Sequence, residues 1–218
     1  MKLLQLFCLA CALASALSAN TVVFGNISCS YPGSDIASCI NEPSLGSDPI
    51  NSVSGEGPIY DSFTSGAAAG QITDLQLILS GDDTSSGSFQ VGLFADNSGT
   101  PGAEIGTSLA TVDDSALSIT PAIYDIALDA SVDADTAYWI GLSDTTTDAY
   151  WSYDSDGSGI GVAGESWFNA SGGPNSDALF GAYQMQVTED TPDTPEPASI
   201  FLIVAGVSVL ALFRRRTA

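Results

Sequence analysis

The run Ile72-Thr73-Asp74-Leu75-Gln76-Leu77-Ile78-Leu79 interleaves apolar and polar side chains. A period near two residues is typical of a β-strand with one face in a core and the other in water. The runs Phe89–Ala95 and Ala137–Ser143 show the same pattern, since alternate apolar side chains fall on one face of each. We therefore predict strands here and at further runs of this kind. The further predicted strands are Thr21–Phe24, Ile59–Thr64, Ile105–Ala110, Ile123–Leu128, Tyr150–Tyr153 and Tyr183–Thr188.

Turn-forming residues separate these runs. The clearest turn signal is Asp96-Asn97-Ser98-Gly99-Thr100-Pro101-Gly102, directly after one predicted strand. No segment before residue 198 carries apolar residues at helical spacing. The pattern predicts an all-β fold, an antiparallel two-layer β-sandwich that is jelly-roll-like. Helices are expected only at the two ends of the chain, as a signal helix and a transmembrane helix.

The charge balance excludes several kinds of site. Among 218 residues there are 26 Asp and Glu, 4 Lys and Arg, and no His, which gives a net charge of −22. Between Gln5 and Phe213 no Lys, Arg or His occurs. No basic patch can therefore contact nucleic-acid phosphates, and no His can act as a general base or zinc ligand. We expect no nucleic-acid partner, no catalytic residues and no enzyme activity.

The first residues are typical of a secretory signal peptide. Lys2 supplies the positive charge of the n-region, and Leu3–Leu13 is apolar apart from Gln5. Leu17-Ser18-Ala19 then offers small residues for cleavage. Residues 1–19 are therefore predicted to be a signal peptide. An N-terminal membrane helix is one alternative, but the apolar run is short for a span. A lipoprotein signal is the other, since Cys8 and Cys11 lie in the run, but neither cysteine is preceded by a good lipobox.

The last residues combine three features. Pro195-Glu196-Pro197 precedes an apolar run from Ala198 to Phe213, and Arg214-Arg215-Arg216 follows it. As a helix, the apolar run would reach roughly 24 Å at 1.5 Å per residue, which is marginal for a bilayer core. The three arginines, Arg214, Arg215 and Arg216, would act as a membrane stop on the cytoplasmic side. A simple membrane anchor is one interpretation.

This order of parts, with Pro195, Glu196 and Pro197 as the motif, resembles the PEP-CTERM sorting signal of Gram-negative bacteria. The resemblance implies recognition by the membrane enzyme exosortase, removal of the tail and transfer of the protein to the cell surface. The runs Val91–Gly102, Thr136–Leu142, Tyr150-Trp151 and Tyr183–Val187 are similar to the "choice-of-anchor R" domain. That likeness implies an extracellular location and a fold type but no reaction.

Five parts are expected along the chain. They are a signal peptide (1–19), an N-terminal extension (20–58), the β-sandwich (59–190), a linker with the Pro-Glu-Pro motif (191–197), and a transmembrane helix with an Arg-rich end (198–218). The extension holds Cys29 and Cys39, the only cysteines left after signal removal. An even pair in an exported chain predicts a disulfide, with two separate buried thiols as the alternative.

The acidic loop after Tyr153 has the ligand spacing of an EF-hand calcium loop. Asp154, Asp156, Ser158 and Glu165 fall at positions one, three, five and twelve of such a loop. However, Gly161 stands where a branched apolar residue is usual, and the flanks are typical of strands. We favour an ordinary exposed loop, with weak calcium binding as the alternative. No other cofactor is predicted.

The sequence contains residues for two further kinds of site, a sugar-binding platform and a hydrolase site. Trp151 and Trp167 could form an aromatic platform for sugar rings, although core packing of large side chains is the preferred interpretation. Paired carboxylates such as Asp113-Asp114 could serve a hydrolase, but adjacent strand residues point to opposite faces.

We therefore expect a non-enzymatic, exported cell-surface or extracellular-matrix protein associated with exopolysaccharide or biofilm. Its expected partners are exosortase, the secretion machinery, exopolysaccharide and, before processing, the inner membrane of a Gram-negative bacterium. The alternatives are a carbohydrate-binding module and a carboxylate-dependent hydrolase.

Overall fold

The structure is a computed structural model that describes residues 19–27, 51–52, 57–81, 87–106, 109–143, 147, 149–153, 159–169, 173–174 and 182–191. The chain divides into one compact unit of residues 20–191 and a second unit of its two ends, 1–19 and 192–218. Both predicted terminal helices and the Cys29–Cys39 disulfide lie outside the described residues. Among the described residues, no helix is long and apolar enough to cross a membrane.

The described part of the chain is built from β-strands and one short 3-10 helix. The strands are β1 (Ala19–Gly25), β2 (Asn51–Ser52), β3 (Ile59–Thr64), β4 (Gly70–Ser80), β5 (Ser88–Asp96), β6 (Pro101–Glu104), β7 (Ala110–Asp113), β8 (Ala122–Val132), β9 (Ala137–Ser143), β10 (Tyr150–Trp151), β11 (Trp167–Asn169), β12 (Gly173–Pro174) and β13 (Met185–Thr191), with the helix η1 (Asp114–Ala116). This confirms the predicted all-β fold.

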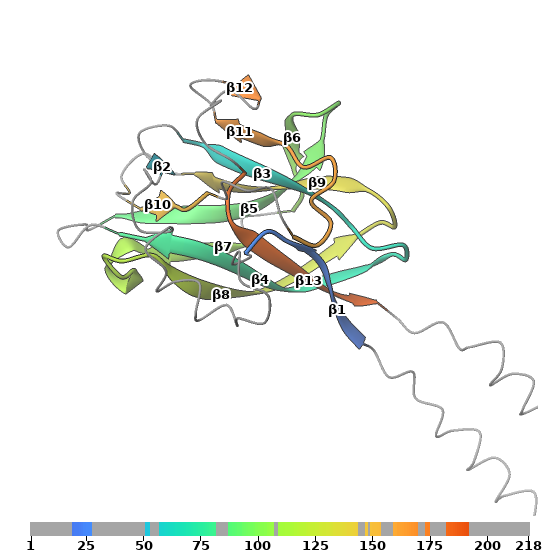
Figure 1. The fold of residues 1–218 in the computed structure, drawn as a ribbon, viewed down its shortest axis with the longest axis horizontal. Helices are drawn as coiled ribbons and strands as arrows, with labels where there is room; N and C mark the ends of the chain where they lie inside the picture. Colours follow the sequence, from blue (N-terminus) through green and yellow to red (C-terminus); the bar gives the residue numbers. More distant parts are fainter. Residues whose placement is uncertain are drawn as a thin grey trace, which may run out of the picture. The chain divides into compact units, whose positions relative to one another are not determined.

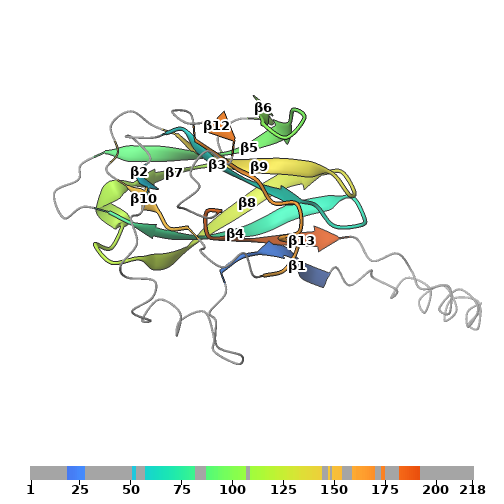
Figure 2. The same cartoon turned by 45° about the horizontal axis from the view of Figure 1, so that its top comes forward.

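The strands form two sheets. The first has the order β1-β13-β4-β10-β2, and β8 pairs with the other side of β4. The second has the order β12-β11-β3-β9-β5-β6, with β7 also pairing with β5. Figures 1 and 2 show them as two layers, with β3, β5 and β9 in one and β1, β4 and β13 in the other.

The pairings within the sheets are nested along the chain. β3 pairs with β9, β4 with β8, and β5 with β7, each in antiparallel fashion. A further antiparallel pair, β5 with β9, joins the innermost pair to the outermost one. Strands far apart in the sequence therefore lie side by side, so the fold depends on long-range contacts.

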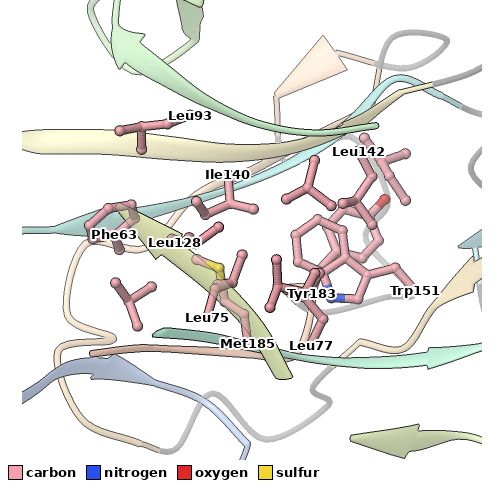
Figure 3. Packing of buried hydrophobic residues seen from close by; sticks show 14 of the residues in the cluster. Phe63, Leu75, Leu77, Leu93, Leu128, Ile140, Leu142, Trp151, Tyr183 and Met185 are labelled. Atoms are coloured by element: carbon pink, nitrogen blue, oxygen red, sulfur yellow. The ribbon is translucent and has the colours of Figure 1, made fainter. Parts of the chain in front are cut away.

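The core lies between the two sheets. Leu75, Leu77 and Met185 reach it from one sheet, and Phe63 and Ile140 from the other (Figure 3). These residues belong to one continuous cluster of buried side chains, which confirms the predicted two-layer arrangement.

The largest side chains of the core form a stacked pair. The rings of Trp151 and Tyr183 are 4.9 Å apart with an interplanar angle of 20° (Figure 3). Trp151 is fully buried, and its Nε1 donates a hydrogen bond of 2.9 Å to the Gln184 carbonyl. Its ring therefore offers no face to a sugar. The prediction of Trp151 as a platform residue is wrong, and the preferred interpretation, core packing, is confirmed for it.

A β-bulge in β4 changes which of its residues point into the core. Ile72 and Leu75 are both fully buried, although three residues of regular strand would place them on opposite faces. Thr73 is the extra residue, since Asp74 pairs with Thr188 of β13 while Ile72 already pairs with Glu189. The bulge shifts the alternation by one residue and lets both apolar ends of β4 enter the core.

One predicted strand is wrong. Ile105–Ala110 was expected to be extended, but β6 ends before it and β7 begins at its last residue. Gly106 has φ +79°, a left-handed conformation that interrupts a strand. The preceding turn is confirmed: Asn97 donates to the Thr100 carbonyl at 2.8 Å, and Ser98 and Gly99 both have positive φ, as in a type I′ turn.

We expect Trp151→Ala to lower the free energy of unfolding by about 3–5 kcal/mol, because it removes a large buried ring and leaves a cavity. Urea unfolding of the purified chain measures this. Ile119→Ala, at a side chain 67% exposed, is the matched control and should change stability by less than about 0.5 kcal/mol. Equal losses in the two variants would contradict the core assignment of Trp151.

Candidate functional site

Residues 159–169 form a segment that joins the two sheets, here called the crossing segment. At its start, Ile160 exchanges backbone hydrogen bonds of 2.8 and 2.9 Å with Gly25 of β1. At its end it becomes β11, which pairs with β3 of the opposite sheet. Figure 1 draws the crossing segment in orange, between β1 and β11. The segment thus connects the edge of one layer to the edge strands of the other.

Glycines let the crossing segment lie directly on β1. A Cβ atom at Gly159 would fall 2.1 Å from the Gly25 carbonyl oxygen, and one at Gly161 would fall 2.5 Å from that of Val23. No larger residue fits at either position without moving the backbone. A turn then closes with the Glu165 amide donating to the Val162 carbonyl at 3.1 Å. This turn directs Glu165 back towards β1 and β3.

Asn26 holds Glu165 in place. Asn26 comes directly after β1, and its side chain is fully buried. Its Nδ2 donates to Glu165 Oε1 at 2.7 Å and to the Tyr183 carbonyl at 2.8 Å. Its Oδ1 accepts from the Met185 amide at 2.7 Å, which fixes the orientation of the amide group. One buried amide therefore ties the crossing segment to both β1 and the start of β13.

Asp61 of β3 lies beside Glu165. Its side chain is fully buried, and its Oδ1 accepts a 2.8 Å hydrogen bond from the Ser62 amide. Its Oδ2 is buried, and no donor among the described residues meets it in hydrogen-bond geometry, although the Tyr183 amide lies close enough to affect the carboxyl. Burial raises the pKa of the Asp61 carboxyl well above its ordinary value, and the neighbouring Glu165 carboxyl raises it further. The amides of Ser62 and Tyr183 act in the opposite direction.

A cavity of about 170 Å³ opens beside Glu165, and Asp61 is not among the residues that line it. Glu165, Ser62 and Thr64 line one part of it, and Asp96 and Trp139 another. Trp139 Nε1 donates to Asp96 Oδ1 at 2.9 Å, so Asp96 is held in place by the sheet. The walls carry carboxylate and hydroxyl oxygens together with apolar side chains such as Phe63 and Ala163.

Two other acids are buried in the described part of the chain. Thr147 Oγ1 donates to Asp114 Oδ1 at 2.5 Å at the start of η1. Asp113, its neighbour, is exposed, so the two carboxyl groups do not act as a pair. On β13, Glu189 Oε2 accepts from the Gly66 amide at 3.1 Å, and no donor among the described residues reaches Oε1. Burial raises the pKa of Glu189, while the Gly66 amide opposes that shift.

The predicted calcium ligands are only in part described. Glu165 contacts Asn26 and Asp61, whereas Asp154, Asp156 and Ser158 lie outside the described residues. Within the described ranges, no three Asp, Glu, Cys or His side chains are grouped as metal ligands. Trp167, the other predicted platform residue, is half-buried and packs against the core cluster. The EF-hand-like site and the role of Trp167 stay predictions.

The sequence analysis missed Asp61 and Asn26. A signal for Asp61 was present, because Ile59 and Phe63 flank it at a spacing of two residues and both are buried. Alternation therefore places this carboxyl on the inward face of β3. Glu189 follows Val187 in the same way on β13. Asn26 had no such signal, since it follows the end of its strand.

Comparisons of this chain with protein-family models, with curated proteins and with solved structures give no match.

We expect Asn26→Ala to lower the free energy of unfolding by about 1–3 kcal/mol, because it leaves buried polar partners unsatisfied. Asn26→Asp should cost more, since a third carboxylate would face Glu165. Urea unfolding at pH 7 compares both variants with Asn97→Ala, a change at an exposed turn residue. An Asn26→Asp protein as stable as the parent would contradict the assigned contacts.

Glu189→Gln should stabilise the protein at neutral pH. A carboxyl whose pKa is raised on folding costs stability as the pH rises from its unfolded pKa, about 4.3, through the folded value. The glutamine keeps the shape without that penalty. Melting temperatures from about pH 4 to 8 should show a gap over the parent that is small at low pH and widens as pH rises. A gap independent of pH would argue against burial as its cause.

Proposed function

We propose that this chain is a non-enzymatic, exported protein of the cell surface or extracellular matrix, sorted by exosortase in a Gram-negative bacterium. The observation that carries the proposal is the succession of Pro195-Glu196-Pro197, the apolar run 198–213 and the arginines 214–216, in a chain that starts with a signal-like segment. These parts lie outside the described residues, so the proposal stands on the sequence.

The described acids support a role without catalysis. Asp61, Asp114 and Glu189 are buried and accept hydrogen bonds from neighbouring backbone or hydroxyl groups. Such contacts hold strands and loops together. With no Lys, Arg or His between Gln5 and Phe213, the body also lacks the partners that activate a nucleophile in most hydrolases.

The nested strand pairs support a jelly-roll-like form of the sandwich, because winding one long antiparallel hairpin produces this nesting. The acidic composition suits an exported matrix component. A net charge of −22 keeps separate copies apart at low salt, and divalent ions would bridge the protein to anionic exopolysaccharide.

Replacing Pro195, Glu196 and Pro197 with alanine tests the sorting proposal. We expect the parent protein to be found outside the inner membrane with a mass that lacks both ends. The variant should keep its C-terminal tail and stay in the inner membrane. Cell fractionation and intact-mass measurement give both answers.

A matched control replaces the preceding triplet, Pro192, Asp193 and Thr194, with alanine. This control should be processed like the parent, because it leaves the Pro-Glu-Pro motif intact. A parent protein that keeps its tail in the inner membrane would make the tail an ordinary anchor and overturn the proposal. Normal processing of the Pro-Glu-Pro variant would overturn it as well.

A further inference from the structure

We propose that Tyr60, Phe94 and Phe168, on the outer face of the second sheet, bind the rings of a neutral polysaccharide. These three side chains are here called the aromatic patch. The inference rests on the proposed association with exopolysaccharide and names a direct contact for it, besides bridging by ions. It uses neither Trp151 nor Trp167.

Strand alternation places the aromatic patch outside the core. Ile59 of β3 and Leu93 of β5 point into the core, so the residues that follow them, Tyr60 and Phe94, point outward. Phe168 of β11 is the strand neighbour of Tyr60 and lies on the same face. All three rings are partly exposed, and none belongs to the core cluster. Packing of the core therefore does not explain them.

The rings of the aromatic patch contact one another edge to face. The centroids of Tyr60 and Phe94 are 5.1 Å apart at an interplanar angle of 88°. Those of Tyr60 and Phe168 are 5.8 Å apart at 67°. The patch extends over the neighbouring strands β11, β3, β9 and β5 (Figure 1). Four strands at their usual spacing cover roughly 14 Å, which is long enough for a short run of sugar rings.

Two glycines form the floor of the aromatic patch. Gly141 of β9 pairs with Tyr60 on one side and with Gly92 of β5 on the other. A Cβ atom at Gly141 would fall 2.5 Å from the Tyr60 ring and 2.7 Å from the Phe94 ring. One at Gly92 would fall 2.7 Å from the Phe94 ring. Covering glycine backbone with rings stabilises a sheet and accounts for Tyr60 and Phe94. Phe168 contacts Tyr60 instead and enlarges the aromatic surface.

Two polar groups lie at the edge of the aromatic patch. Glu104 of β6 is exposed, and its Oε1 lies 3.1 Å from the place of a Cβ atom at Gly92. Partial burial raises the pKa of the Tyr60 hydroxyl, and the nearby Glu104 carboxylate raises it further, so the hydroxyl keeps its proton at neutral pH. Within the described part of the chain, no hydrogen bond occupies either group. A hydroxyl and a carboxylate are thus available to the hydroxyl groups of a sugar.

The charge of the aromatic patch favours a neutral sugar. Aromatic faces and a carboxylate are negative, and they complement the C–H and O–H groups of a sugar ring. An anionic polysaccharide would be repelled. A second copy would bring its own Glu104 to the same surface, and no Lys, Arg or His between Gln5 and Phe213 offsets that repulsion. A cationic group is the remaining alternative, through contact with the aromatic faces.

Affinity electrophoresis of the full chain, in gels that contain a polysaccharide, tests the proposal. The neutral probes are hydroxyethyl cellulose, mixed-linkage β-glucan and galactomannan, and alginate is the anionic comparison. We expect at least one neutral probe to retard the parent and alginate to leave it unchanged. Phe94→Leu and Phe168→Leu keep an apolar side chain but lose the aromatic face, and each should weaken binding by about twofold to tenfold. Ile160→Ala, at a side chain 57% exposed outside the patch, is the matched control and should bind like the parent.

Two further variants leave the ring packing in place. Tyr60→Phe loses only the hydroxyl group and should weaken sugar binding while keeping the parent's melting temperature. Glu104→Gln keeps a hydrogen-bonding group without the charge, so sugar binding should persist. Calorimetric binding of tetramethylammonium that Phe168→Leu and Glu104→Gln both remove would assign the patch to cations and overturn the proposal.

Three outcomes of the electrophoresis would also overturn it. A parent that no neutral probe retards would do so and would leave export and processing untouched, because fractionation measures those separately. Retardation that Phe94→Leu and Phe168→Leu both keep would place the sugar elsewhere on the chain. Equal retardation by alginate and by the neutral probes would show binding without regard to charge.

Discussion

The constraint on which this structure depends is the neutralisation of buried carboxyl groups without any basic side chain nearby. Asp61, Asp114 and Glu189 are all buried in a stretch that holds no Lys, Arg or His. Burying a carboxylate alone costs several kcal/mol, so each must be protonated or bonded. The described partners are backbone amides, one threonine hydroxyl and, for Asp61, a second carboxyl group. Hydrogen bonds from the backbone and from one hydroxyl therefore take the place of basic side chains at these buried acids.

The contacts of the crossing segment explain why so polar a site lies inside a β-sandwich. The segment leaves one sheet at Gly25 and joins the other at β3, and Asn26 satisfies backbone groups at Tyr183 and Met185 along the way. Those backbone groups belong to the region where Tyr183 stacks on Trp151 in the core. The polar site and the apolar core thus share one stretch of backbone, and a change in either is expected to affect the other.

Much of the fold could be predicted because a half-buried strand shows itself in the alternation of apolar and polar residues along a short stretch of sequence. The alternation in Ile59–Thr64 and Ala137–Ser143 gave both strands their observed bounds. The prediction for Ile105–Ala110 was wrong, because a left-handed Gly106 outweighs its apolar content. The two-residue strands β2 and β12 are too short for any alternation to show, and they exist only because a partner strand lies beside them.

The sequence alone determined the all-β class, most of the strands and the inward direction of Asp61, because each follows from a period of two residues along one strand. Only the tertiary structure decided which groups meet Asp61. Glu165 reaches it through a turn that two close-packed glycines and Gly164 make possible, and Asn26 holds Glu165 from 139 residues away. No local pattern encodes a contact over that distance. It arises from the pairing of strands and from the cost of leaving buried polar atoms without partners.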